Sequence, residues 1–380
     1  MASTVALVRC PDYAATEGAL AETLALLGGL GAFVPRGATV LVKPNLLAAA
    51  PPDKAVCTHP AVLRAVVRAL REAGARVLVG DSPSLGTTGR VAEAAGIAQV
   101  CAAEGATLVP FQRKVSVAYP QGLVCKSFPL ADVLAQVDLV VNLPKLKTHT
   151  LTRYTGAVKN LFGCVVGAEK PRFHLRFQDP ADFAGMLVDL CGLVRPALTV
   201  LDGVMAMEGN GPRNGRPRPL GVLLAGADAA AVDAVAGSLI GLGPEAVLTT
   251  ALARRRQAGG AEATAVHVLG ERPEQLAARD FRLPRGGSTM AWGLPAGMGD
   301  WVRRQVNPSP WAVPERCTGC GDCMAVCPPH IVTLEGGKAH LGGSGCIYCY
   351  CCQEVCPEGA VELAEGRVLH LLHHGLLKGW

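Results

Sequence analysis

Short apolar runs alternate along this chain with longer stretches in which apolar residues recur at helical spacing. A short, wholly apolar run is typical of a strand buried on both faces, and recurrence every three or four residues indicates a helix packed by one side. Strands are predicted at residues 4–10, 39–42, 76–79, 107–111, 138–141, 198–201, 220–225 and 265–268. Helices are predicted at 13–30, 60–73, 89–104, 182–194 and 228–256, with a β-hairpin at 114–128.

The order of these elements predicts the fold class. Strands that alternate with helices favour an α/β fold, with a mostly parallel sheet and helices on both of its faces. The composition agrees, because 50% of the residues are hydrophobic and only 18% are charged. A chain of 380 residues is long for one domain, so we expect at least two.

Cysteines concentrate near the C-terminus in two copies of one pattern, C-x2-C-x2-C-x3-C-P. The first copy is Cys317, Cys320, Cys323, Cys327, and the second is Cys346, Cys349, Cys352, Cys356. In bacterial two-cluster ferredoxins the fourth cysteine of each such run binds the other cluster. We therefore expect two [4Fe–4S] clusters, one on Cys317, Cys320, Cys323 and Cys356 and the other on Cys346, Cys349, Cys352 and Cys327.

Zinc and disulfides are the simpler alternatives for these thiols. Structural zinc takes its ligands in pairs that are usually separated by a longer gap, and disulfides need an oxidising compartment. Neither fits two tight runs of four. Cys351 stands beside Cys352 as a spare thiol, and we expect it to pack and not to bind a cluster.

Domain boundaries follow from these patterns. We expect a large α/β domain over residues 1–283, a connecting segment rich in Gly, Pro and Trp over 284–313, and a small α+β ferredoxin-like domain over 314–366. The tryptophans of the connecting segment predict that it is pinned across the large domain. The tail, residues 367–380, is predicted to form a short helix.

Charge divides the chain into an acidic and a basic part. Residues 314–366 hold seven acids and two bases, whereas residues 1–313 hold thirty-two bases and twenty-four acids. No basic run is interleaved with aromatic residues, so nucleic-acid binding is not predicted. The sequence has no secretory signal and no apolar run of about 18 residues, which predicts a cytoplasmic protein without a membrane span.

Specific polar residues follow the predicted strands of the large domain. Ligands of open α/β sheets bind outside the carboxyl ends of the strands, so we expect these residues to form the site. The predicted anion-holding and proton-transferring residues are Lys43, Asp81, Lys145, Lys147, His149, Lys159, Asp202 and Glu208. Residues predicted to bind a cofactor are Asn45, Asn160, Arg213 and Arg216. For any one lysine a solvated side chain is the simpler interpretation, and for His149 a structural hydrogen bond.

Six short motifs together resemble the family called domain of unknown function 362. They are residues 42–45 (Val-Lys-Pro-Asn), 58–60 (Thr-His-Pro), 80–83 (Gly-Asp-Ser-Pro), 142–149 (Asn-Leu-Pro-Lys-Leu-Lys-Thr-His), 156–163 and 201–203 (Leu-Asp-Gly). The resemblance covers residues 3–275, and members of the family often carry a C-terminal ferredoxin-type module. The large domain is also distantly similar to the N-terminal domain of the nickel-dependent lactate racemase family, which implies likeness of fold alone.

These observations favour an iron–sulfur oxidoreductase acting on a small anionic substrate in the large domain. A redox partner protein, a ferredoxin or a reductase, would supply its electrons, and the crevice leaves room for an additional unidentified cofactor. Two other functions remain open: an electron carrier or scaffold for cofactor assembly, and a non-redox isomerase with structural clusters. The sequence predicts no oligomeric state.

Overall fold

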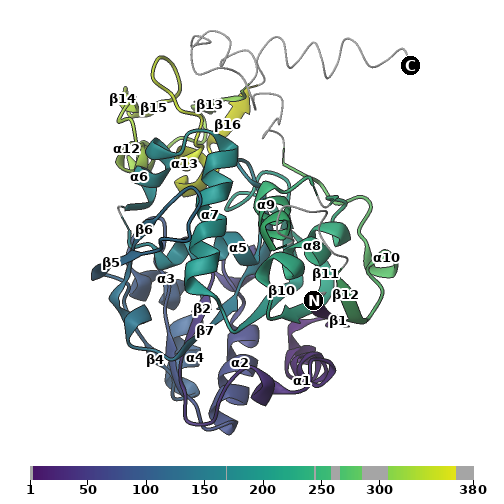
Figure 1. Cartoon of the computed structure of the whole chain (residues 1–380). Coiled ribbons are helices and arrows are strands. Elements are labelled where there is room, and N and C mark those ends of the chain that lie inside the picture. Colours follow the sequence, from purple (N-terminus) through teal and green to yellow (C-terminus); the bar gives the residue numbers. More distant parts are fainter. Residues whose placement is uncertain (1–2, 168, 244, 258–265, 285–306, 365–380) are drawn as a thin grey trace.

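Two bodies make up the structure, a computed structural model that describes residues 3–167, 169–243, 245–257, 266–284 and 307–364 (Figure 1). The large α/β domain fills the lower part of the view. The small module, coloured yellow-green, lies above it beside α6 (Glu169–Arg176) and the upper end of α7 (Pro180–Val194). The expected large domain and C-terminal module are both recognisable.

One ten-stranded sheet forms the centre of the large domain, in the order β12-β1-β11-β10-β7-β2-β3-β4, with β8 and β9 attached beside β10. Neighbours are parallel from β10 through β7, β2 and β3 to β4, and antiparallel where β11 meets β1 and β10. The predicted mostly parallel sheet is confirmed. Its strands are β1 (Thr4–Arg9), β2 (Thr39–Pro44), β3 (Arg76–Val79), β4 (Thr107–Leu108), β7 (Leu139–Leu143), β8 (Lys145–His149), β9 (Arg153–Thr155), β10 (Leu198–Glu208), β11 (Arg216–Gly226) and β12 (His267–Gly270).

Helices cover both faces of this sheet. Alternate residues of β2 point to opposite sides, so Val40 and Val42 join the core under one helical layer while Leu41 joins a core on the other face. The first layer contains α1 (Thr16–Leu26), α2 (Pro60–Glu72), α3 (Thr88–Ala94) and α4 (Ile97–Ala103). On the other side lie α5 (Ala157–Asn160), α7, α8 (Ala229–Leu239) and α9 (Leu248–Gln257), with α10 (Pro273–Leu276) packed against α8.

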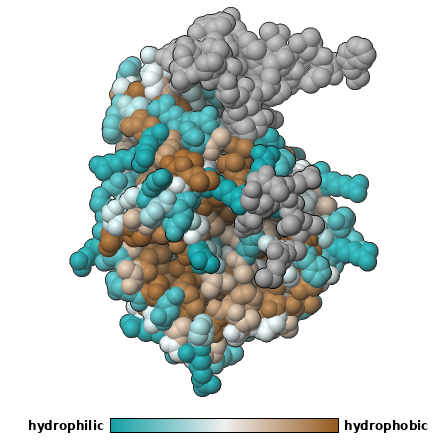
Figure 2. All heavy atoms as spheres, in the orientation of Figure 1, coloured by the Kyte–Doolittle hydropathy of each residue, from teal (hydrophilic) through white to brown (hydrophobic). Residues whose placement is uncertain are grey.

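Surface hydropathy is uneven on the face shown in Figure 2. Brown, apolar residues gather over the middle of the large domain, where α7 lies in Figure 1, and teal residues project from the rim. Helix α7 is apolar along most of its length, and its residues from Phe183 to Leu190 are buried. This helix therefore belongs to the core although it lies on the near side of the domain.

Two local predictions differ from the structure, and a third is confirmed with a longer second strand. The helix expected at 89–104 is divided into α3 and α4 by Gly96, whose φ of 73° lies in the left-handed region that favours glycine. The strand expected to end at residue 201 continues to Glu208, because β10 pairs with β11 along a long hairpin. The hairpin expected at 114–128 forms as β5 (Lys114–Ala118) and β6 (Ser127–Ala131).

The small module consists of two short helices and two antiparallel strand pairs. Its helices are α12 (Asp322–Val326) and α13 (Cys351–Val355), and its strands are β13 (Ser309–Ala312), β14 (Thr333–Glu335), β15 (Lys338–His340) and β16 (Val361–Ala364). Strand β13, which the sequence analysis assigned to the connecting segment, pairs with β16. Trp292, Trp301 and the tail from residue 367 lie outside the described residues.

Candidate functional site

A cavity of about 80 Å³ lies between the two domains. The large domain contributes residues that follow β2 and β3, together with β8, α5 and α6. The module contributes Val326 from α12 and Cys351, Glu354 and Val355 from α13. The site expected at the carboxyl ends of the strands therefore has one wall that belongs to the cluster module.

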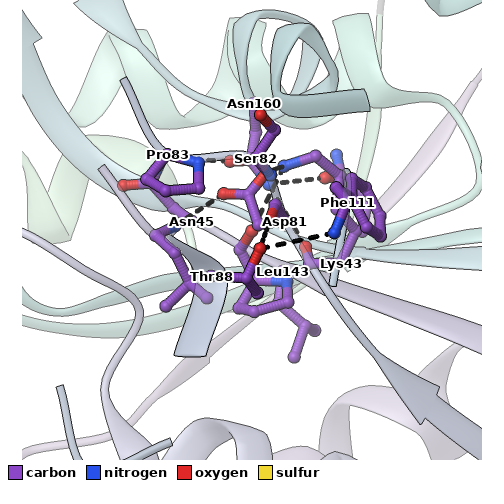
Figure 3. Close-up of polar contacts among 12 residues, drawn as sticks. Lys43, Asn45, Asp81, Ser82, Pro83, Thr88, Phe111, Leu143 and Asn160 are labelled. Carbon is purple, nitrogen blue, oxygen red and sulfur yellow. Dashed lines mark hydrogen bonds and ion pairs between the residues drawn. The ribbon is translucent and has the colours of Figure 1, made fainter. Parts of the chain in front are cut away.

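A buried ion pair lies beneath this cavity (Figure 3). Lys43 Nζ is 2.7 Å from Asp81 Oδ1, and both side chains are almost wholly buried. Asp81 also accepts hydrogen bonds from the backbone amides of Leu46, at 2.7 Å, and Ser82, at 2.9 Å. Because both charges are compensated, this pair orders the loops after β2 and β3.

A second network holds Lys147 at the cavity. Its Nζ donates to Asn45 Oδ1 and to the carbonyl of Val56, both at 2.7 Å. Asn45 Nδ2 donates to Asn160 Oδ1 at 3.1 Å, and Asn160 Nδ2 donates to Asn142 Oδ1 at 2.8 Å. Burial lowers the pKa of Lys147 to about 7, and the charge of Glu354 offsets only part of the loss of solvent.

Lys159 differs from the other lysines of the site. Its side chain lines the cavity, and its ammonium makes no hydrogen bond or ion pair with any described residue. The nearest aromatic partner is Phe162, whose ring centroid lies 5.9 Å from Nζ. Burial lowers the pKa of Lys159, while the charge of Glu354 opposes this shift. The half-buried ammonium of Lys159, without a hydrogen-bond acceptor among the described residues, is therefore available to a group bound in the cavity.

His149 of the large domain and Glu354 of the module are in contact at the cavity, where His149 Nε2 lies 3.0 Å from Glu354 Oε1. His149 Nδ1 accepts hydrogen bonds from the amides of Leu151, at 3.1 Å, and Thr152, at 3.4 Å, so its proton belongs on Nε2. Burial lowers the pKa of His149 to about 4, so the imidazole is neutral at pH 7. Nε2 and Oε1 are close, but their geometry falls short of a hydrogen bond, and neither atom has another partner among the described residues.

The cavity residues that were not predicted from the sequence include three with basic or acidic side chains: Lys170, His174 and Glu354. Lys170 Nζ donates to the carbonyls of Ser82 and Pro83, and burial lowers its pKa to about 8. His174 stacks on the ring of Phe183 at 4.4 Å, and burial lowers its pKa to about 3. The sequence signal for the first two is the i, i+3, i+4 spacing of Lys170, Phe173 and His174 in an otherwise polar stretch, which places them on one helix face.

Other predicted site residues do not line the cavity. Lys145 Nζ lies 2.8 Å from Asp202 Oδ2 and 2.7 Å from the hydroxyl of Tyr13, in a separate, fully buried cluster. Glu208 accepts a hydrogen bond from the amide of Arg282 at 3.1 Å. Their burial and local pairing indicate structural roles. Arg216 is exposed on β11, and Arg213 contacts the module.

The cysteine runs fold around two centres. Cys317, Cys320, Cys323 and Cys356, which include the fourth cysteine of the second run, line one cavity in the module. Cys352 has Cys346, Cys349 and Cys327 among its electrostatic neighbours. Among the described residues, no three His, Cys, Asp or Glu side chains converge on a single metal ion. Thiols arranged around a volume fit an iron–sulfur cluster better than one zinc ion.

The family follows from the sequence matches. Domain of unknown function 362 matches residues 40–238, and a 4Fe–4S dicluster domain matches residues 309–357. The chain belongs to the domain of unknown function 362 family. A member of this family with a C-terminal ferredoxin-type module is what the cysteine runs and the strand-end motifs predicted, and that prediction is confirmed.

Relatives cover either most of the chain or its module alone. A thylakoid-associated protein of Synechocystis sp. is 36% identical over 298 residues, which are 78% of this chain and 92% of that protein. An uncharacterized ferredoxin of Methanocaldococcus jannaschii is 38% identical over 50 residues, 12% of this chain and 81% of the relative. Among the described residues, no helix has the length and apolar character needed to cross a bilayer.

Similarity to solved structures is distant. The lactate racemase apoprotein from Thermoanaerobacterium thermosaccharolyticum aligns with a TM-score of 0.39 and 11% identity, over 60% of this chain and 54% of that one. A likeness of this size carries no inference about activity.

Proposed function

We propose that this chain is an iron–sulfur oxidoreductase whose substrate is a small anion bound in the cavity between the domains. The proposal includes two [4Fe–4S] clusters, on the two sets of four thiols described above, which when bound supply one-electron transfer. The observation that supports it most directly is Lys159, whose ammonium faces the cavity without a hydrogen-bonding or ion-pairing partner among the described residues.

The charges around the cavity favour an anion. Lys43 is neutralised by Asp81, and Glu354 faces His149, but Lys147 and Lys170 are held only by neutral oxygen atoms. Burying cations in this way is unfavourable unless an opposite charge compensates them. A carboxylate or comparable small anion bound in this cavity of about 80 Å³ supplies that charge.

Two side chains at the cavity can hold or move protons. Electron transfer to an organic substrate has to be matched by protons from the protein, because a cluster relay supplies none. His149 carries its proton on Nε2, and the pKa of Lys147, lowered to about 7 by burial, allows it to donate and regain a proton near neutral pH.

The module supports an oxidoreductase over a free-standing carrier, because Cys351, next to the cluster ligand Cys352, lines the same cavity as Lys159. The acidic surface of the module suits a redox partner protein that recharges the clusters. The proposal places the protein in the cytoplasm, whose reducing conditions suit its unpaired thiols.

The test uses the full chain, loaded with iron and sulfide under anaerobic conditions. Calorimetry with acetate, oxalate, crotonate and phosphate measures anion binding, and electron paramagnetic resonance of the dithionite-reduced protein follows reoxidation by each compound. We expect Lys159→Met to weaken binding at least tenfold, with clusters that still reduce, and to slow any ligand-dependent reoxidation. Lys126→Met, at an exposed lysine of the 114–131 hairpin, is the control and should behave as wild type.

Equal binding by both variants would overturn the proposed anion site. Clusters that reduce and reoxidise identically in wild type and Lys159→Met, with no anion bound, would instead indicate a carrier or scaffold.

A further inference from the structure

The hairpin loop at residues 209–215, between β10 and β11, reaches from the large domain to the module. Its base is fixed against β8 and the residues after it: the amide of Gly211 donates to Thr148 Oγ1 at 3.2 Å, and Thr150 Oγ1 donates to the carbonyl of Gly211 at 3.4 Å. A Cβ atom at Gly211 would lie 2.2 Å from the carbonyl oxygen of Thr148, so only glycine permits this approach. The loop is therefore held in place before it meets the module.

Two side chains of this loop donate hydrogen bonds to the end of α13. Arg213 Nη1 donates to the carbonyl of Val355. Asn214 Nδ2 donates to the carbonyls of Gln353, at 3.4 Å, and Cys356, at 3.2 Å. Cys356 is the fourth thiol of the set that includes Cys317, Cys320 and Cys323, so the loop forms a hydrogen bond with the backbone of a predicted cluster ligand.

The guanidinium of Arg213 has no carboxylate within 4 Å among the described residues, although its side chain is half-buried. Burial lowers the pKa of Arg213, and the groups that oppose this shift include Asp322, Cys356 and Cys320. Two of these groups are thiols of one cluster set. Because Arg213 Nη1 donates to the carbonyl of Val355, the residue before Cys356, its charge lies beside that set.

We propose that Arg213 raises the reduction potential of the cluster bound by Cys317, Cys320, Cys323 and Cys356. With four thiolates, a [4Fe–4S] cluster carries a charge of about −2 when oxidised and about −3 after it gains one electron. A nearby cation stabilises the more negative form, and partial burial limits the screening of this interaction by salt. One electron is gained, no bond is formed or broken, and no proton is required.

The large domain would then set the potential of a cluster to which it supplies no ligand. The loop at residues 209–215 of the large domain would then determine which electron donors can reduce this cluster. This inference requires the clusters but is independent of the anion in the cavity, so it goes beyond the proposed function.

The experiment is a potentiometric titration of the anaerobically loaded full chain with dithionite, followed by electron paramagnetic resonance. At a fixed ambient potential, we expect Arg213→Gln to lower the ratio of reduced to oxidised cluster about tenfold for the cluster that includes Cys356. For a one-electron couple, this change corresponds to a shift of about 59 mV to lower reduction potential. Arg216→Gln removes the same charge from an exposed position three residues away and should leave the ratio unchanged. Arg213→Lys keeps the charge and should retain at least half of the effect.

Asn214→Ala separates charge from docking, because it removes the hydrogen bonds to α13 while Arg213 remains. An unchanged ratio in Arg213→Gln, or an equal shift in Arg216→Gln or Asn214→Ala, would overturn the proposal. Iron and sulfide contents of each variant show that the compared proteins carry the same clusters.

Discussion

His149 of the large domain and Glu354 of the cluster module lie 3.0 Å apart, Nε2 to Oε1, across a buried interface. Glu354 lies on α13, between Cys352 and Cys356, which are both predicted to be cluster ligands. Thr150 Oγ1 donates to Gln353 Oε1, on the same helix, at 2.6 Å. Helix α13, which carries one predicted cluster ligand and is followed directly by another, therefore also closes the candidate substrate cavity.

Replacement of Glu354 is expected to loosen the module. Glu354→Ala removes the carboxylate that lies 3.0 Å from His149 and whose charge favours the protonated form of Lys159, so contacts between the module and the large domain are lost. We expect faster amide hydrogen exchange in α13, measured by mass spectrometry on the loaded full chain. Glu358→Ala, at an exposed position close by, is the control. Equal exchange in the two variants would show that Glu354 does not hold the interface.

Gly163 is expected to be essential for the Lys43–Asp81 pair. A Cβ atom at Gly163 would lie 1.9 Å from Asp81 Oδ1 and 2.7 Å from Lys43 Nζ, so Gly163→Ala must separate the two charges. Breaking a buried pair costs about 3–5 kcal/mol of unfolding free energy. Urea unfolding followed by circular dichroism measures this loss. Gly89→Ala, in α3 with nothing within 4 Å, should unfold like wild type, and a wild-type curve for Gly163→Ala would contradict the geometry.

Anion affinity is expected to depend on pH through Lys147. Burial lowers the pKa of this lysine to about 7, and a bound anion favours its protonated form. Affinity should therefore rise as pH falls through about 7, by up to about tenfold per unit, and a second rise near 8 is expected from Lys170. Calorimetry between pH 6 and pH 9 tests this. Lys147→Met should remove the lower transition and keep the upper one; a persisting lower transition would assign it elsewhere.

Cys351 is expected to be dispensable for cluster binding. Its side chain lines the cavity between the domains and lies beside Cys349 alone of the second run's other predicted ligands besides Cys352, whereas Cys352 has Cys346, Cys349 and Cys327 as electrostatic neighbours. Cys351→Ala should keep about eight irons per chain, and Cys352→Ala should lose about half of them. Iron and acid-labile sulfide assays measure both. Loss of iron from Cys351→Ala, with iron retained in Cys352→Ala, would show that Cys351 and not Cys352 is the cluster ligand.

Features encoded within one stretch of chain could be predicted from the sequence. The cysteine spacing predicted both ligand sets, and the apolar runs predicted the strands whose ends carry Asn45, Asp81 and Lys147. Those three residues do line the cavity. These three residues lie together because parallel strands bring their carboxyl ends to the same edge of a sheet.

Features that depend on contacts between distant segments could not be predicted. Glu354 follows His149 by 205 positions in the sequence and reaches the site only because α13 docks against the large domain. Lys145 and Lys147 share one short strand, yet Lys145 turns to Asp202 and Tyr13, away from the cavity. The Asp-Gly at residues 202–203 suggested a strand end, but pairing with β11 carries β10 through it. Tertiary pairing overrode the local signal in each case.

A cavity wall shared by two domains also constrains how this protein can evolve. Neither domain can be replaced by an unrelated one without loss of part of the cavity wall, and a new side chain at position 354 has to suit His149 and Lys159 at the same time. We therefore expect the two domains to be inherited together, including in genomes that encode them as two separate polypeptides.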